Sequence, residues 1–133
     1  MNAISPAMLV AFLAMPATAP IPKESVAPLL SQPLPGVVGK RFTAAVVTFP
    51  PGARSASHRH GAAFLYAYVL EGSVQSRIDG EPMQGYHVGQ GGTEQPGADH
   101  LLTANFSTVR PARLLVTFVS NDGDPLKTSD PRP

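Results

Sequence analysis

Proline and glycine recur so often along this chain that few stretches are long enough to form a helix. The 133 residues include 15 prolines and 12 glycines. Proline in a helix interior removes a backbone hydrogen bond and clashes with the preceding turn, whereas both residues are common in the tight turns between short strands. The sequence therefore favours an all-β fold built from short strands.

Strand-like runs lie between these turns. Phe42–Phe49 is rich in β-branched and aromatic residues and ends at a Pro-Pro-Gly turn, and Ser73–Asp79 alternates apolar with polar side chains. Further strands are expected at residues 62–70, 83–88, 92–95, 100–106 and 113–120. Short antiparallel strands without intervening helices are typical of a sandwich or barrel.

Segments of different composition flank this central region. Residues 1–19 contain the apolar run Ala7–Met15 and then Ala17-Thr18-Ala19, which fits the small-x-small pattern of a cleavage site. We therefore expect a signal peptide and a periplasmic or secreted protein, or a cytoplasmic one if this segment is not a signal. Residues 20–36 are a proline-rich leader that could add a strand to a sheet edge, residues 37–120 the barrel, and residues 121–133 a polar, mobile tail.

Charge and cysteine content narrow the classes of function. A net charge of +1 with 14% charged residues predicts no nucleic-acid partner. The sequence contains no basic amphipathic run, so membrane-surface binding is not predicted for the mature protein. The absence of cysteine removes disulfides, thiolate ligands and cysteine nucleophiles. Histidines and carboxylates are left to carry any chemistry.

The strongest local signal for chemistry is a His-x-His pair. On a strand, residues i and i+2 project from the same face, so His58 and His60 can reach one metal ion while Arg59 points the other way. His100 follows the turn at residues 95–99 and could add a third nitrogen from another strand. Three imidazoles leave positions on an ion open, which is typical of a catalytic site.

These histidines belong to two groups of residues whose spacing matches a known pair of motifs. The matching residues are Gly52, His58, His60, Gly72, Gly89, Gly97 and His100. They resemble the cupin superfamily, specifically its small single-domain conserved-barrel (cupin type-2) proteins. Leu65, or Phe64 on the shorter spacing, stands where that family has a glutamate. Gln95 replaces a motif proline and Asn105 is one position late.

The resemblance implies a fold, a cofactor and an assembly. The fold would be a single cupin-type double-stranded β-helix, or jelly-roll, barrel. The cofactor would be one divalent transition metal on the three histidines, with iron preferred and zinc, manganese or nickel as the other candidates. Small cupins often pair through an outer sheet or exchange N-terminal strands, so a homodimer is also expected.

Glu94 is the candidate replacement for the missing motif glutamate. It lies just before the turn that leads to His100, and strand parity cannot decide its direction because the turn resets which face each side chain takes. Three roles stay open: a fourth metal ligand, an acceptor for an imidazole N–H or a general base beside the metal, and a solvated loop carboxylate.

Other residues carry weaker expectations. Gln75 and Arg77 form the polar face of a strand and could hold a substrate carboxylate, or could simply face solvent. Tyr66 and Tyr68 are expected to pack outward, and His87 matches neither motif and is expected on a surface strand.

The functional prediction is a metal-dependent enzyme that acts on a small organic molecule. Three histidines suit dioxygenase-like chemistry on iron, whereas the same ligands on other metals suit a lyase, decarboxylase or isomerase. The alternative is a non-catalytic module that binds a small molecule or a metal. A structural domain with a vestigial site is a third, weaker hypothesis. Cupin barrels host many activities, so the resemblance does not choose among them.

Overall fold

The computed structural model describes residues 10–130, and residues 1–9 and 131–133 lie outside the described part. Within it the chain forms ten strands and no helix. The strands are β1 (Ser25–Pro33), β2 (Lys40–Phe49), β3 (His58–Arg59), β4 (Phe64–Glu71), β5 (Ser73–Ile78), β6 (Gln84–His87), β7 (Gly91–Glu94), β8 (Asp99–Ala104), β9 (Ala112–Asn121) and β10 (Thr128–Ser129).

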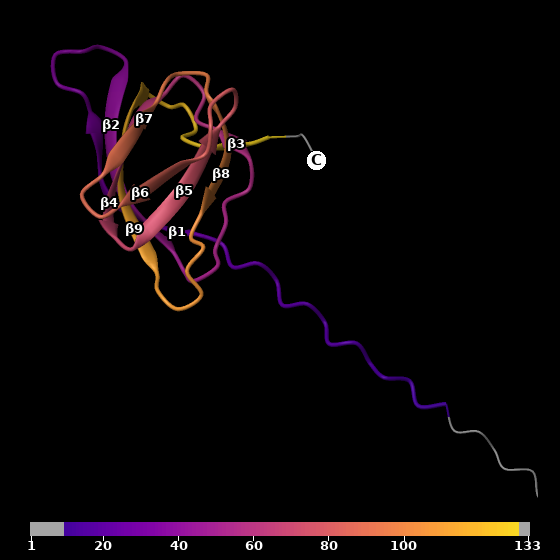
Figure 1. The fold of residues 1–133 in the computed structure, drawn as a ribbon. Helices are drawn as coiled ribbons and strands as arrows, with labels where there is room; N and C mark the ends of the chain where they lie inside the picture. Colours follow the sequence, from indigo (N-terminus) through magenta and orange to yellow (C-terminus); the bar gives the residue numbers. More distant parts are fainter. Residues whose placement is uncertain (1–9, 131–133) are drawn as a thin grey trace, which may run out of the picture.

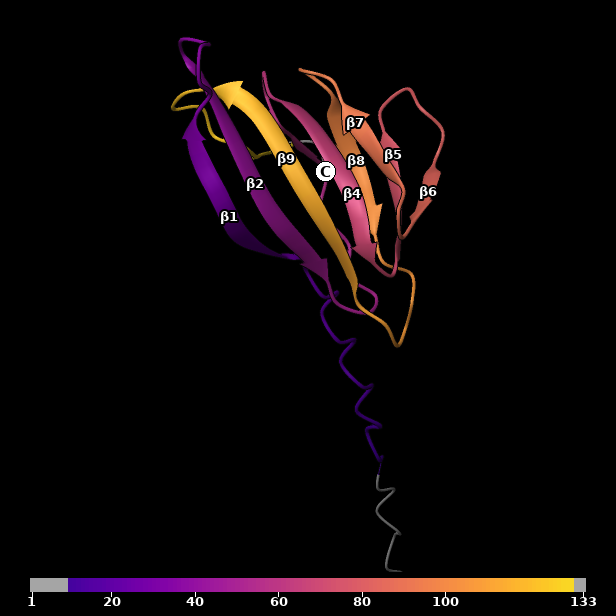
Figure 2. The ribbon, with the colours of Figure 1, turned by 90° about the vertical axis from the view of Figure 1, so that its left-hand side faces the viewer.

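The strands make two antiparallel sheets that face each other (Figure 1). One sheet has the order β1-β2-β9-β4-β7, and the other has the order β10-β3-β8-β5-β6. Figure 2 shows β1, β2, β9 and β4 side by side across the first sheet. The expected all-β jelly-roll fold is confirmed.

Alternation along the strands places the core between the sheets. In β9 every second residue is buried, beginning with Ala112 and continuing to Ser120. This is the period of two that a strand with one buried face requires. The core contains Phe49, Ala53, Ala63, Leu65, Val69, Val74, Ala112, Leu114, Val116 and Phe118.

The two flanking segments both join the sheets. The leader supplies β1, which pairs with β2 from Ser25↔Thr48 to Pro33↔Arg41 and forms one edge of its sheet. The polar tail is not the loose segment expected from its composition, because β10 pairs with β3 through Thr128↔Arg59 and Ser129↔His58. Both flanking segments are therefore held against the barrel, and the tail lies directly beside His58.

Residues 10–23, which lead into β1, belong to neither sheet. This segment contains no strand, its large apolar side chains are exposed, and it runs away from the barrel (Figure 1). The predicted signal peptide, residues 1–19, lies partly outside the described residues. Between residues 10 and 130 no helix has the length and apolar character needed to cross a membrane. Export and homodimer formation stay predictions, which N-terminal sequencing and light scattering would check.

Asn105 holds the loops at one end of the barrel. It is buried, and its Nδ2 donates to the carbonyls of Phe49, Pro50 and Arg110 at 3.0, 3.2 and 2.7 Å. Its Oδ1 accepts a hydrogen bond from the Ser107 N–H at 3.0 Å. Buried amides are costly unless they are satisfied in this way, so Asn105 stabilises the loop after β8.

Gly72 makes a sharp turn between β4 and β5, and we expect it to tolerate no side chain. Its φ is +70°, and an added Cβ would lie 2.5 Å from the Pro111 carbonyl oxygen. Gly72→Ala should therefore lower the free energy of unfolding by about 3 kcal/mol, from backbone strain and overpacking together.

Gly80 is the matched control for this substitution. Its φ is +80°, but an added Cβ would meet no atom of the described structure within 4 Å. Gly80→Ala should cost only the left-handed backbone penalty, about 1 kcal/mol. Urea denaturation of both variants would check the difference, and equal losses would contradict it.

Candidate metal centre

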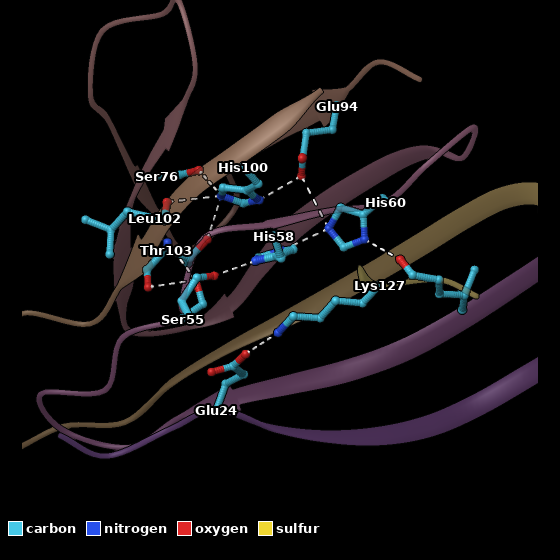
Figure 3. Close-up of polar contacts among 12 residues, drawn as sticks. Glu24, Ser55, His58, His60, Ser76, Glu94, His100, Leu102, Thr103 and Lys127 are labelled. Carbon is cyan, nitrogen blue, oxygen red and sulfur yellow. Dashed lines mark hydrogen bonds and ion pairs between the residues drawn. The ribbon is translucent and has the colours of Figure 1, made fainter. Parts of the chain in front are cut away.

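Strand pairing brings the three histidines together from separate parts of the chain. β3 pairs with β8 so that His58 lies directly opposite His100, and His60 follows β3 immediately. One ring nitrogen from each histidine lies within 4.8 Å of the others (Figure 3). Phe118 of β9 packs against the His60 ring at a centroid distance of 5.4 Å. The expected three-histidine set is thus assembled inside the barrel.

Arg59 lies on the other face of β3, as the alternation predicted. Its guanidinium forms an ion pair with Asp99 at 2.8 Å, and Asp99 is the cross-strand partner of Arg59. Arg59 and Asp99 therefore stabilise the pairing of β3 with β8 on this face. His58 and His100 face inward.

The hydrogen bonds of His58 and His60 define their tautomers. His58 Nδ1 lies 2.8 Å from the Ala56 carbonyl, and His60 Nδ1 contacts the Leu126 carbonyl. Because a carbonyl only accepts, each Nδ1 carries the hydrogen and each Nε2 of a neutral ring is a bare lone pair. The two Nε2 atoms face each other at 3.1 Å.

Two lone pairs in this position suit a shared cation. Nitrogens that bind one ion at about 2.1 Å each lie about 3.0 to 3.4 Å apart, for angles between octahedral and tetrahedral values. The observed 3.1 Å falls in this range. The pair therefore fits a metal ion better than it fits a hydrogen bond.

His100 turns its other nitrogen toward the same place. Its Nε2 contacts Thr103 Oγ1 at 2.8 Å, Ser76 Oγ at 2.9 Å and the Leu102 carbonyl at 3.1 Å. Its Nδ1 is buried and, within residues 10–130, makes no hydrogen bond of acceptable geometry. This nitrogen is the one left for an ion.

Glu94 completes the cluster. Its Oε2 lies 2.9 Å from His100 Nδ1 and 3.9 Å from His60 Nε2, and its side chain is only 5% exposed. Its Oε1 is buried, and no atom of the described chain forms a hydrogen bond with it. Buried polar atoms without partners are costly, and an ion would satisfy both Oε1 and His100 Nδ1.

Cross-strand register explains why Glu94 points inward. In the β4–β7 pair Glu94 is directly opposite Leu65, and residues directly opposite in antiparallel strands share a face. The carboxyl therefore enters the barrel beside the position where the cupin motif has its glutamate. The solvated-loop alternative for Glu94 does not hold.

The electrostatics of the cluster favour the ligand forms. Burial lowers the pKa of His58 to about 4. The hydrogen bond with the Ala56 carbonyl acts in the opposite direction, whereas the neighbouring His100 and His60 also lower the pKa. Burial likewise lowers the pKa of His60. Burial raises the pKa of Glu94, but the close contact with His100 outweighs this and holds the pKa below its ordinary value. Neutral imidazoles and a carboxylate are the donor set of divalent transition metals.

The cluster opens onto an apolar cavity of about 270 Å³ between the sheets. β5 contributes Val74, Ser76 and Ile78 to its lining. Gln75 and Arg77 are exposed on the opposite face, so the structure does not bring them to the cavity as expected for substrate binding. The reason is burial, because the apolar residues of β5 take the inner face and the alternation sends the polar ones outward.

The remaining expectations concern residues outside the cluster. Tyr66 is 40% exposed on the outer face of β4, and His87 is exposed on β6. Sequence reasoning missed the contributions of the leader and the tail, since Glu24, Leu126 and Lys127 all line the cavity. No local signal marks these residues, because only long-range pairing brings them to the site.

Comparison with known proteins agrees with this architecture. A family model described as "Cupin domain" matches residues 45–118. No curated protein matches the sequence significantly. Among solved structures, the chain is similar to an uncharacterized conserved protein with a double-stranded beta-helix domain from Klebsiella pneumoniae, at 17% identity and a TM-score of 0.60, over 82% of this chain and 84% of that one.

Two further similar structures are larger proteins. The DMSP lyase DddQ from Ruegeria pomeroyi is 24% identical with a TM-score of 0.57, over 66% of this chain and 42% of that one. An oxalate oxidase in complex with glycolate is 21% identical with a TM-score of 0.62, over 79% of this chain and 54% of that one. The chain thus spans about half the length of these two proteins, and at these identities the likeness shows the fold alone.

Proposed function

Because this chain belongs to the Cupin domain family, and because its three histidines meet inside the barrel, we propose that it is a mononuclear metal enzyme acting on a small organic molecule. His58, His60 and His100 would hold one divalent transition metal, with iron preferred. The observation that carries the proposal is the pair of bare Nε2 atoms 3.1 Å apart in the lining of an apolar cavity. We further propose dioxygenase-like chemistry.

The ion would act there as a Lewis acid or as an activator of dioxygen. With Leu65 in place of the motif glutamate, the three imidazoles alone leave its charge uncompensated. Glu94 lies close enough to supply a carboxylate as a ligand, or to take a proton from a bound substrate. The mainly apolar lining lowers the local polarity, which would strengthen each of these interactions.

A lyase on the same scaffold is the related alternative within the enzyme class. The similar structures include both an oxidase and a lyase, according to their names. They support the view that a barrel of this fold can carry either oxidase or lyase chemistry. The choice rests on the metal, since three histidines on iron favour oxygen chemistry and the same ligands on zinc, manganese or nickel favour elimination or isomerisation.

A non-catalytic binding module is the second candidate. Leu65 removes an acidic group from the position that the cupin motif reserves for one, and most of the cavity lining is apolar. A barrel of this kind can hold a ligand without turning it over. Turnover separates the two candidates.

The proposal is tested on untagged protein purified without chelator. We expect about one transition-metal ion per chain by elemental analysis, and oxygen uptake with a diketone, flavonoid or keto acid. Bound metal with no oxygen uptake and no product from any of these compounds would favour the binding module. Protein that is folded but binds no added divalent metal would overturn both the site and the proposed enzyme.

A further inference from the structure

The cavity combines an apolar body with very few charges. Beyond the metal cluster, the charged side chains among the described residues that line it are Glu24 and Lys127. Lys127 Nζ and Glu24 Oε1 form an ion pair at 2.7 Å. No arginine between residues 10 and 130 lines the cavity, so Lys127 is the cation available to a bound anion there.

Lys127 lines the cavity, is partly exposed and lies close to the histidines. Its neighbour Leu126 accepts the Nδ1–H hydrogen bond of His60. The Lys127 side chain runs beneath His58 and His60 toward Glu24 (Figure 3). It is 48% exposed, whereas the Glu24 side chain is 13% exposed. An ammonium has three donors, and the pair with Glu24 leaves others for a ligand.

The charges around the cavity sum to one uncompensated positive charge when an ion is present. Glu24 and Lys127 cancel, the three imidazoles are neutral, and the Glu94 carboxylate offsets one of the two charges of a divalent ion. Burying a charge without a partner is unfavourable. A ligand with one negative charge therefore completes the balance, whereas a neutral or doubly charged ligand does not.

Size and lining restrict the rest of the ligand. The cavity of about 270 Å³ corresponds to about nine water molecules at about 30 Å³ each. Most of its wall beyond the cluster is formed by aliphatic and aromatic residues such as Val69, Leu114 and Phe118. An apolar body on the order of ten non-hydrogen atoms is the complement of this space.

We propose that the site takes a small, mainly apolar molecule with a single carboxylate, and that Lys127 in the cavity lining holds that carboxylate beside the metal centre. This inference rests on the proposed function, because the metal ion supplies part of the positive charge. It makes Lys127 a specificity-determining residue and separates this site from one for small dicarboxylates.

Three probes of similar length test the charge requirement. Hexanoate, hexanamide and adipate carry one, zero and two negative charges on a six-carbon chain. By calorimetry on metal-loaded protein at constant ionic strength, we expect hexanoate to bind at least about tenfold more tightly than either of the others. Equal affinities, or tightest binding of hexanamide or adipate, would overturn the inference.

Variants test the role of Lys127. Lys127→Met keeps the length of the side chain but removes the charge, and should weaken hexanoate binding about tenfold while leaving hexanamide binding unchanged. Lys127→Arg should retain most of the hexanoate affinity. Arg77→Met is the matched control, because it removes an exposed positive charge outside the cavity and should leave hexanoate binding unchanged. A Lys127→Met protein with full hexanoate affinity would contradict the assignment.

The metal content of the same samples distinguishes a wrong ligand class from a wrong metal site. Metal-loaded protein that fails to discriminate the probes overturns only the assignment of the ligand class. Folded protein that binds no metal overturns the proposed function, and this inference with it. In metal-free protein the preference for hexanoate should disappear, because Glu94 is then a buried negative charge without a counterion.

Discussion

Replacing any one of His58, His60 or His100 with alanine should remove most of the bound metal. The three nitrogens lie within 4.8 Å of one another, and each histidine is held by its own hydrogen bonds to the barrel. Losses of groups that only orient a ligand already cost about 10- to 100-fold in affinity. We therefore expect each variant to bind metal at least about 100-fold more weakly in equilibrium titrations.

His87→Ala is the control for these variants. His87 is exposed on β6 and belongs to no metal cluster in the described chain, so its replacement should leave metal affinity unchanged. Circular dichroism should confirm that all four variants are folded, because His58 is buried. Equal metal retention in the four proteins would remove the basis of the three-histidine site.

Glu94→Gln should have the second-largest effect, and its pattern identifies the role of the carboxyl. The substitution keeps the shape of the side chain and removes the charge beside His100. Because Oε1 is buried without a partner and Oε2 lies beside two of the histidines, we expect metal affinity to fall roughly 10- to 100-fold. Titration of the metal into wild type and variant would measure this.

A different pattern would assign Glu94 to proton transfer. A variant that keeps its metal but loses turnover, with a pH–rate profile that lacks the acidic limb, would make the carboxylate a general base. Glu81→Gln removes an exposed carboxylate elsewhere and should change neither property. If Glu94→Gln behaved in the same way, Glu94 would have no part in the site.

Most of the fold could be predicted from local patterns. The strand expected at residues 42–49 is β2 within two residues, and the one at 113–120 is β9 within one. Such runs are recognisable because their own β-branched and apolar residues repeat with a period of two. The two-residue strand β10 was not expected, since two residues are too few to show any period, and β3 was inferred only from the spacing of His58 and His60.

The candidate site, too, could be predicted only in part from the sequence. His58 and His60 share a face because of their spacing alone, and the turn before His100 marks it as the next candidate. The placement of Gln75 and Arg77 depended on which face of β5 turns inward. The apolar face, which includes Val74, packs into the core between the two sheets, and the polar face with Gln75 and Arg77 is therefore exposed.

By itself the sequence determined the all-β class, the histidine pair and the turns around it, because each depends on residues that are close along the chain. Only the tertiary structure decided that Glu94 faces Leu65, that Leu126 holds His60, and that Lys127 forms an ion pair with Glu24 in the cavity lining. Lys127 and Glu24 are separated by 103 positions. Contacts of this kind follow from strand register and sheet pairing, which the whole fold sets and no local pattern encodes.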